Sequence, residues 1–96
     1  MKLMIFTAPW CSHCKVLKRT IAGMDFAAAY PELETVEVNV DERGDLAEDY
    51  GIMSIPTLLL IDKDQVVARL TGERSKTIID EFIRNHISAK EDEIYG

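Results

Sequence analysis

The two cysteines of the chain lie two residues apart in the stretch Trp10-Cys11-Ser12-His13-Cys14. If Cys11 caps a helix and Cys14 lies in its first turn, one helical turn brings their Cα atoms within the roughly 7 Å that a disulfide requires. Unpaired N–H groups and the helix dipole at that end favour negative charge, and therefore the Cys11 thiolate. A thiolate is the nucleophile of thiol–disulfide exchange, and His13 and Lys15 add positive or polarisable character nearby. We expect Cys11 to attack and Cys14 to resolve.

The cysteine pair has two other interpretations. In a zinc site, Cys11, His13 and Cys14 supply at most three ligands, whereas structural zinc takes four. The chain has one further histidine, His86, which falls at the far end of an expected late helix. A permanent structural disulfide closes so short a loop that it stabilises the fold little. Neither alternative explains the motif as well as redox cycling does.

Composition limits the class of protein. The chain has 96 residues and is 47% hydrophobic, which predicts one globular domain spanning residues 1–96. A net charge of −6 argues against nucleic acid as a main partner. The apolar run from Leu3 to Phe6 is far shorter than the roughly 18 residues of a membrane helix, and too short for the core of a signal peptide. We therefore expect a cytoplasmic protein with no membrane partner.

The elements that must position the cysteines follow from local patterns. Residues 2–7 form an apolar strand, and a helix runs from Cys11 to about Gly23. Residues 24–33 are ambiguous, with Asp25 as a cap for one further turn. Residues 35–40 alternate as a second strand, with three valines on one face and Glu37 and Asn39 on the other. Asp45 is expected to cap a short helix that ends at Gly51.

The second half of the chain is expected to contain a hairpin and a helix. Strands 57–61 and 66–71 are antiparallel because their link is short, and the first is apolar throughout and therefore central. A final helix begins at Glu73 or Ser75, and the tail from Ser88 is expected to fray. Its inward stripe is Ile78, Ile79, Phe82, Ile83 and Ile87. The fold class is α/β, a four-stranded mixed sheet with helices on both faces in the order βαβαββα.

Beyond the cysteines, several stretches resemble the thioredoxin family. Ala8-Pro9-Trp10-Cys11 is similar to the active-site approach, Val38-Asn39-Val40-Asp41 to a core strand, and Ile55-Pro56-Thr57 to the loop and strand that carry the family's cis-proline. The resemblance covers about residues 2–87, and the family's usual first strand and helix are absent. It implies a thioredoxin-like fold of minimal size, of phage or bacterial type.

The resemblance also implies the residues that meet the substrate. Ile55-Pro56 is expected to be a cis peptide, with Pro56 against the disulfide and Ile55 paired with an extended substrate segment. Trp10 flanks the site as an exposed aromatic residue, and Ser12 and Gly72 line the same groove.

The chain departs from the family pattern below the disulfide. Ile5 occupies the position of a buried aspartate, and Glu37 occupies the position of a lysine on the neighbouring strand. If Glu37 is buried below Cys14, the loss of hydration favours its protonated form and suits it to general-base work. The alternative is a partly exposed carboxylate with no role.

The pair between the cysteines is Ser12-His13, where thioredoxins have Gly-Pro. A histidine just before the second cysteine resembles protein disulfide isomerase. Such a histidine stabilises the Cys11 thiolate and hence the reduced form. We expect a reduction potential above that of ordinary thioredoxin by roughly 20–60 mV.

The resemblance implies a thiol–disulfide oxidoreductase that reduces protein disulfides through a Cys11/Cys14 cycle. It implies no bound cofactor, thioredoxin reductase as electron donor, ribonucleotide reductase as a client, and a monomer. One alternative is a glutathione-coupled glutaredoxin, although Thr71-Gly72-Glu73 lacks the Gly-Gly pair, followed by an acidic residue, that is expected for glutathione recognition. Another is a thioredoxin-fold binding subunit in which redox turnover is incidental.

Overall fold

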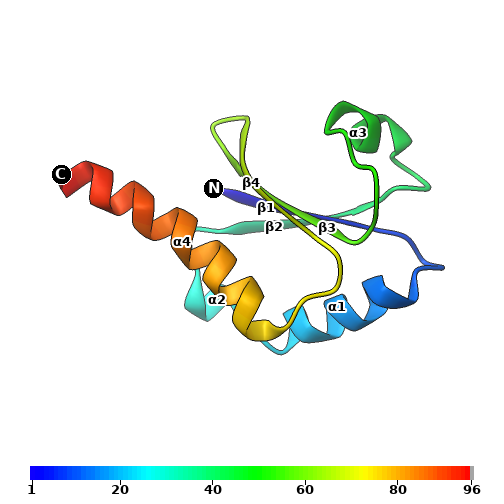
Figure 1. Cartoon of the computed structure of the whole chain (residues 1–96), viewed down its shortest axis with the longest axis horizontal. Helices are drawn as coiled ribbons and strands as arrows, with labels where there is room; N and C mark the ends of the chain where they lie inside the picture. The colour runs from blue at the N-terminus through cyan, green and yellow to red at the C-terminus, as the bar shows by residue number, and fades with distance from the viewer. Residues whose placement is uncertain (96) are drawn as a thin grey trace.

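The chain folds around a four-stranded mixed sheet (Figure 1). This computed structural model describes the backbone of residues 1–95 and the side chains of residues 1–87. The first half contains β1 (Lys2–Thr7), α1 (Ser12–Ala22), α2 (Phe26–Ala29), β2 (Glu34–Asn39) and α3 (Gly44–Asp49). The second half contains β3 (Thr57–Asp62), β4 (Gln65–Thr71) and α4 (Lys76–Tyr95).

The strand order is β2-β1-β3-β4, which places the two most apolar strands in the centre. β1 is parallel to β2, with Ile5 opposite Glu37, and antiparallel to β3, with Phe6 opposite Thr57. The link between β3 and β4 is a tight turn in which Lys63 and Asp64 both have positive φ, as the right-handed twist of a hairpin favours. The predicted α/β fold class and sheet are therefore confirmed.

Helices cover both faces of the sheet (Figure 1). One core lies under α1, α2 and α4 and the other under α3, because alternate residues of β1 and β3 point to opposite faces. The first buries Leu3, Ile5, Leu17, Met24, Leu58, Leu60, Ile79 and Ile83. The second buries Met4, Phe6, Val38, Leu59 and Ile61, with Leu46 and Tyr50 packed against it. The two cores therefore hold the end of β1 and the start of α1 against the sheet.

Several element boundaries differ from the sequence predictions. β2 begins and ends one residue earlier than predicted, although the Val40 N–H still donates to the Thr7 carbonyl at 2.9 Å. Asp25 adopts a left-handed conformation before α2 and makes no capping hydrogen bond through its side chain. The cap predicted for Asp45 is wrong, because α3 begins at Gly44 after Arg43. The Asp45 carboxylate instead accepts two hydrogen bonds from the Arg43 guanidinium, and these hold the pKa of Asp45 below its usual range.

The final helix corrects two further expectations. Ser75 caps it, since its Oγ accepts from the Ile78 N–H at 3.3 Å, but the Ile78 side chain is 42% exposed and lies outside the core. The stripe packs through Ile79 and Ile83, which are fully buried. The backbone stays helical to Tyr95 instead of ending near Ile87, consistent with the helix-favouring Ala, Lys and Glu residues there. Within the described part of the chain, no helix is long and apolar enough to cross a membrane.

Candidate functional site

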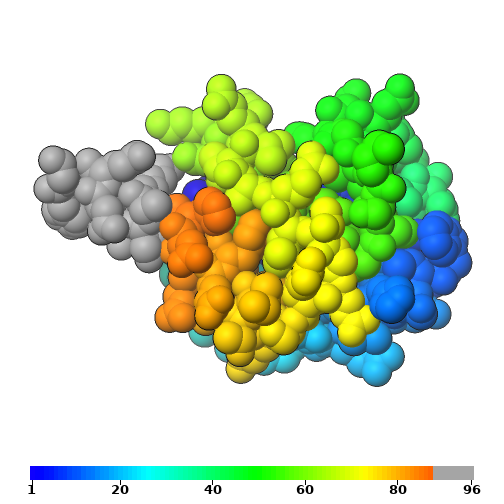
Figure 2. Space-filling model, in the orientation of Figure 1, coloured from blue at the N-terminus to red at the C-terminus, as the bar shows by residue number. Residues whose placement is uncertain are grey.

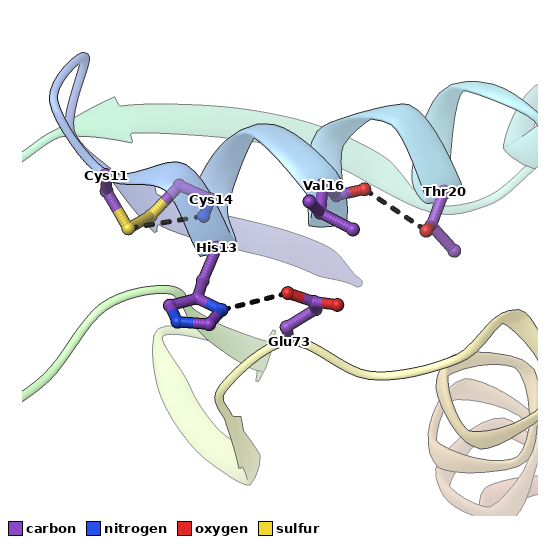
Figure 3. A network of polar contacts seen from close by, with 6 residues as sticks. All are labelled: Cys11, His13, Cys14, Val16, Thr20 and Glu73. Carbon is purple, nitrogen blue, oxygen red and sulfur yellow. Dashed lines mark hydrogen bonds and ion pairs between the residues drawn. A yellow bond between two sulfur atoms is a disulfide. The ribbon is translucent and has the colours of Figure 1, made fainter.

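The two cysteines form a disulfide at the start of α1 (Figure 3). Cys11 is the N-cap residue of α1, with extended backbone, and Cys14 lies one turn along the helix. Their Cα atoms are 5.2 Å apart. The Cys14 N–H donates to Cys11 Sγ at 3.2 Å, so the sulfur occupies the position that a Ser or Asp side chain takes at other helix starts. The same N–H can stabilise negative charge on Cys11 when the disulfide is reduced.

The burial of the two sulfur-bearing residues is unequal. Cys11 is 7% exposed, whereas Cys14 is 1% exposed. Both pack with Ala8 in a small apolar cluster, against which Val40 and Ile55 are partly buried. Cys11 is therefore the more accessible of the two cysteine residues.

The segment that leads from β1 to Cys11 forms a turn. The Cys11 N–H donates to the Ala8 carbonyl at 3.2 Å, which closes this turn. Trp10, at its tip, is 68% exposed, as the sequence analysis expected. Its indole N–H donates to the Asp41 carboxylate at 3.0 Å, so the ring is tethered from the far end of β2. The sequence analysis missed this role of Asp41, because the two residues are distant in the chain.

A second loop lies against the disulfide. The Ile55–Pro56 peptide bond is cis, and Pro56 is fully buried. Ile55 contacts the cysteine cluster. The Pro56 carbonyl accepts from the Gly72 N–H at 2.8 Å, and Gly72 has a φ of +85°, which favours glycine. The start of α1, the loop before β3 and the segment after β4 meet on one face of the molecule (Figure 2).

His13 contacts a carboxylate from the other end of the chain (Figure 3). Its Nδ1 lies 3.0 Å from Oε1 of Glu73, which follows Gly72 in the segment between β4 and α4. The His13 side chain is 73% exposed and that of Glu73 is 39% exposed. Sequence reasoning missed Glu73 as a site residue, because no spacing rule connects positions so far apart.

Glu37 lies on the other side of α1, beside a cavity. Its Oε1 is 2.8 Å from Lys18 Nζ and accepts from the Thr7 hydroxyl at 3.2 Å. The cavity, of about 290 Å³, also reaches Cys14. Its lining comprises Thr7, Ala8, Pro9, Cys14, Lys15, Lys18, Glu37 and Asn39.

Of the two interpretations of Glu37, the structure supports a partly exposed carboxylate over a buried one, since the side chain is 47% exposed. The physical reason is the position of β2 at the edge of the sheet, where α1 covers the strand only in part. Glu37 does face the α1 side, as the alternation of β2 predicted, because it is opposite the buried Ile5.

Among the described residues, no three His, Cys, Asp or Glu side chains are close enough to hold an ion together. His86 lies on α4, where its ring nitrogen contacts the Phe82 carbonyl at 2.7 Å.

Comparison with known proteins matches this arrangement to one family. The family model described as Thioredoxin matches residues 1–85. A thioredoxin of Haemophilus influenzae is 39% identical over 87 residues, covering 88% of this chain and 78% of the relative. A thioredoxin of Bacillus subtilis is 35% identical over 82 residues, covering 85% and 78%. The crystal structure of a thioredoxin from Nicotiana alata superposes with a TM-score of 0.75 at 29% identity, covering 86% of this chain and 70% of that one.

Proposed function

This chain belongs to the thioredoxin family and is a thiol–disulfide oxidoreductase, and from that premise we propose which residue performs each step. Cys11 is the attacking thiol and Cys14 the resolving thiol. The observation that carries this assignment is the hydrogen bond from the Cys14 N–H to Cys11 Sγ at 3.2 Å, at the N-cap of α1. A thiolate there gains a charge-assisted hydrogen bond and the favourable end of the helix dipole.

The reaction transfers two electrons from the protein to a substrate disulfide. The Cys11 thiolate attacks one substrate sulfur, the substrate S–S bond breaks, and the departing thiolate takes a proton. Cys14 then loses its proton and attacks Cys11 Sγ, which breaks the mixed disulfide and releases the second substrate sulfur as a thiol. The protein is left with the Cys11–Cys14 disulfide. Of the two protons on the reduced substrate, one replaces the proton that Cys14 loses, and the other comes from the solvent, which took it up when Cys11 ionised.

Residues around the disulfide form the proposed substrate groove. Trp10, next to Cys11 in the chain, presents an exposed ring, and Ile55, before the cis peptide, packs against the cysteine cluster. Ser12 begins α1 beside Cys11, and Gly72 is joined to Pro56 by its N–H. An extended substrate segment pairs with the backbone of Ile55, and Pro56 shields the disulfide from side reactions.

Two polar residues tune the chemistry in this proposal. His13 stabilises the Cys11 thiolate and raises the reduction potential above that of a thioredoxin with Gly-Pro between its cysteines. Glu37 accepts the Cys14 proton through the solvent of the shared cavity, even though its carboxylate is half-exposed. Support for this role comes from the lining, which places Glu37 and Cys14 on the same cavity.

The cellular setting is also proposed. Proteins of this family interact with a thioredoxin reductase and with disulfide clients, and we infer the same for this chain. Ribonucleotide reductase is one expected client. We further infer a cytoplasmic, monomeric, single-domain protein of residues 1–96 that uses no cofactor beyond its own disulfide.

Coupled assays test this function. Reduction of a protein disulfide should be sustained by NADPH with thioredoxin reductase, and much more weakly by glutathione with glutathione reductase. The reverse ratio would instead support the glutaredoxin-type activity. Cys11→Ser should abolish turnover, whereas Cys14→Ser should accumulate a mixed disulfide with substrate. A Cys11→Ser/Cys14→Ser double variant that kept its full biological function would support a binding subunit.

A further inference from the structure

We infer that Glu73 is a positioning residue that competes with the Cys11 thiolate for His13 and so lowers the reduction potential of the site. The inference depends on the proposed role of Cys11 as the attacking thiol. The observation behind it is the 3.0 Å contact between His13 Nδ1 and Glu73 Oε1 in the disulfide form (Figure 3). Glu73 acts through His13, not by touching a substrate.

The contact fixes one proton of His13. A carboxylate only accepts hydrogen bonds, so the imidazole nitrogen that meets it must carry its proton. His13 lies in the first turn of α1, between the two cysteines. In the disulfide form neither sulfur carries charge, and Glu73 is the anion with which the ring pairs.

The backbone around Glu73 is held on both sides. Before it, the Gly72 N–H donates to the Pro56 carbonyl at 2.8 Å. After it, Arg74 Nε donates to the Thr71 carbonyl at 3.0 Å, and Ser75 caps α4. The carboxylate is therefore presented to the start of α1 by a segment that is anchored to the same Pro56 loop that packs on the disulfide.

Reduction changes the charges around the ring. When Cys11 becomes a thiolate, the imidazole of His13 has two anions to stabilise, the thiolate and the Glu73 carboxylate. Because the ring is already paired with Glu73, it stabilises the thiolate less than an unpaired ring would. The carboxylate also repels the new thiolate directly. Both effects disfavour the reduced form. Because the groups are exposed, we expect a modest net effect, within the roughly 1.5- to 5-fold range of surface ion pairs.

The test is redox equilibration with glutathione at neutral pH. Glu73→Gln should shift the equilibrium towards the reduced protein by about threefold, which is about 14 mV at 29.6 mV per tenfold change. Glu34→Gln is the matched control. It removes the same charge from an exposed glutamate opposite Lys2, at the other end of β1 from the disulfide, and should leave the potential unchanged.

Two further measurements separate positioning from a general charge effect. In a His13→Gln background, Glu73→Gln should shift the equilibrium by less than half as much. Nitrogen-15 spectra of the oxidised protein should show a hydrogen-bonded His13 Nδ1–H that disappears in Glu73→Gln. Glu73→Asp should retain part of both signals.

An unchanged or lowered potential in Glu73→Gln would overturn the inference, as would an equal shift in the His13→Gln background. These outcomes are distinct from failure of the proposed function, because they are measured on a protein whose disulfide-reducing turnover is checked first. If the unmodified protein reduced no disulfide, the function itself would be wrong.

Discussion

Replacement of Glu37 by glutamine removes the carboxylate that shares a cavity with Cys14 while keeping the shape of the side chain. The structure places this group 2.8 Å from Lys18 Nζ and within reach of the Thr7 hydroxyl. If it accepts the Cys14 proton, Glu37→Gln should slow the step in which Cys14 attacks the mixed disulfide. The first half of the reaction, at Cys11, should not change.

The magnitude follows from the exposure of the carboxylate. General bases contribute roughly 100- to 10,000-fold, and the largest values belong to desolvated groups. Glu37 is 47% exposed and already paired with Lys18, so solvent can partly replace it. We expect about a tenfold loss in the rate of resolution, equivalent to about 1.4 kcal/mol in the barrier.

The assay isolates that step. A mixed disulfide is formed between Cys11 and a chromogenic aromatic thiol, and release of the thiol by Cys14 is followed in a single turnover. Glu37→Asp should restore part of the rate, and Glu34→Gln, on the same strand but absent from the cavity lining, should match the unmodified protein. If Glu37→Gln released the thiol as fast as the unmodified protein does, the reasoning would be refuted. It would also be refuted if the alkylation rate of Cys11 fell by the same factor as the release rate.

Three other perturbations have definite outcomes. His13→Pro should lower the reduction potential by about 20–60 mV in a glutathione titration, since it removes the ring that stabilises the reduced form. Gly72→Ala should reduce the free energy of unfolding in urea by about 1–2 kcal/mol, because φ is +85° and the nearest atom to the added Cβ is 4.0 Å away, which leaves backbone strain as the cost. Burial, followed by the hydrogen bond from the Tyr30 hydroxyl to Asp80, raises the pKa of Tyr30 from 10.0 to about 12. The unfolded chain therefore loses this proton first, so stability is full below pH 10 and falls as the pH rises towards 12. Urea unfolding curves measured between pH 10 and 12 should show this decrease in the free energy of unfolding for the unmodified protein. The decrease should be smaller for Tyr30→Phe.

The fold was largely predictable because local patterns and tertiary burial agree. The continuous apolar runs of β1 and β3 predicted central strands, and the short link to β4 predicted an antiparallel hairpin. Cys11 was expected at a helix cap, and it lies there. In each case the residues that decide the structure are neighbours in the sequence.

The errors fall where tertiary contacts decide. Asp45 has the residue type of a helix cap, but it lies inside the first turn of α3, where it pairs with Arg43. Ile78 fits the helical stripe, yet it lies at the margin of the core on α4. Glu37 faces the predicted side of the sheet, and the edge position of β2 decides between the two interpretations that the sequence left open for its burial.

The partners of the site residues were beyond sequence reasoning. Asp41 meets Trp10, and Glu73 meets His13, across 31 and 60 positions of the chain. Such contacts depend on the crossover between β1 and β2 and on the packing of the segment after β4 against α1. No periodicity or motif within one chain records them.

The most direct test of the account is the separate titration of the two thiols by alkylation across pH, in the reduced protein and in each single Cys→Ser variant. The account predicts that Cys11 reacts first and is already a thiolate at a pH where a free cysteine is still a thiol, while Cys14 stays unreactive. A Cys11 that ionises like a free cysteine, together with a Cys14 that is alkylated first, would contradict it.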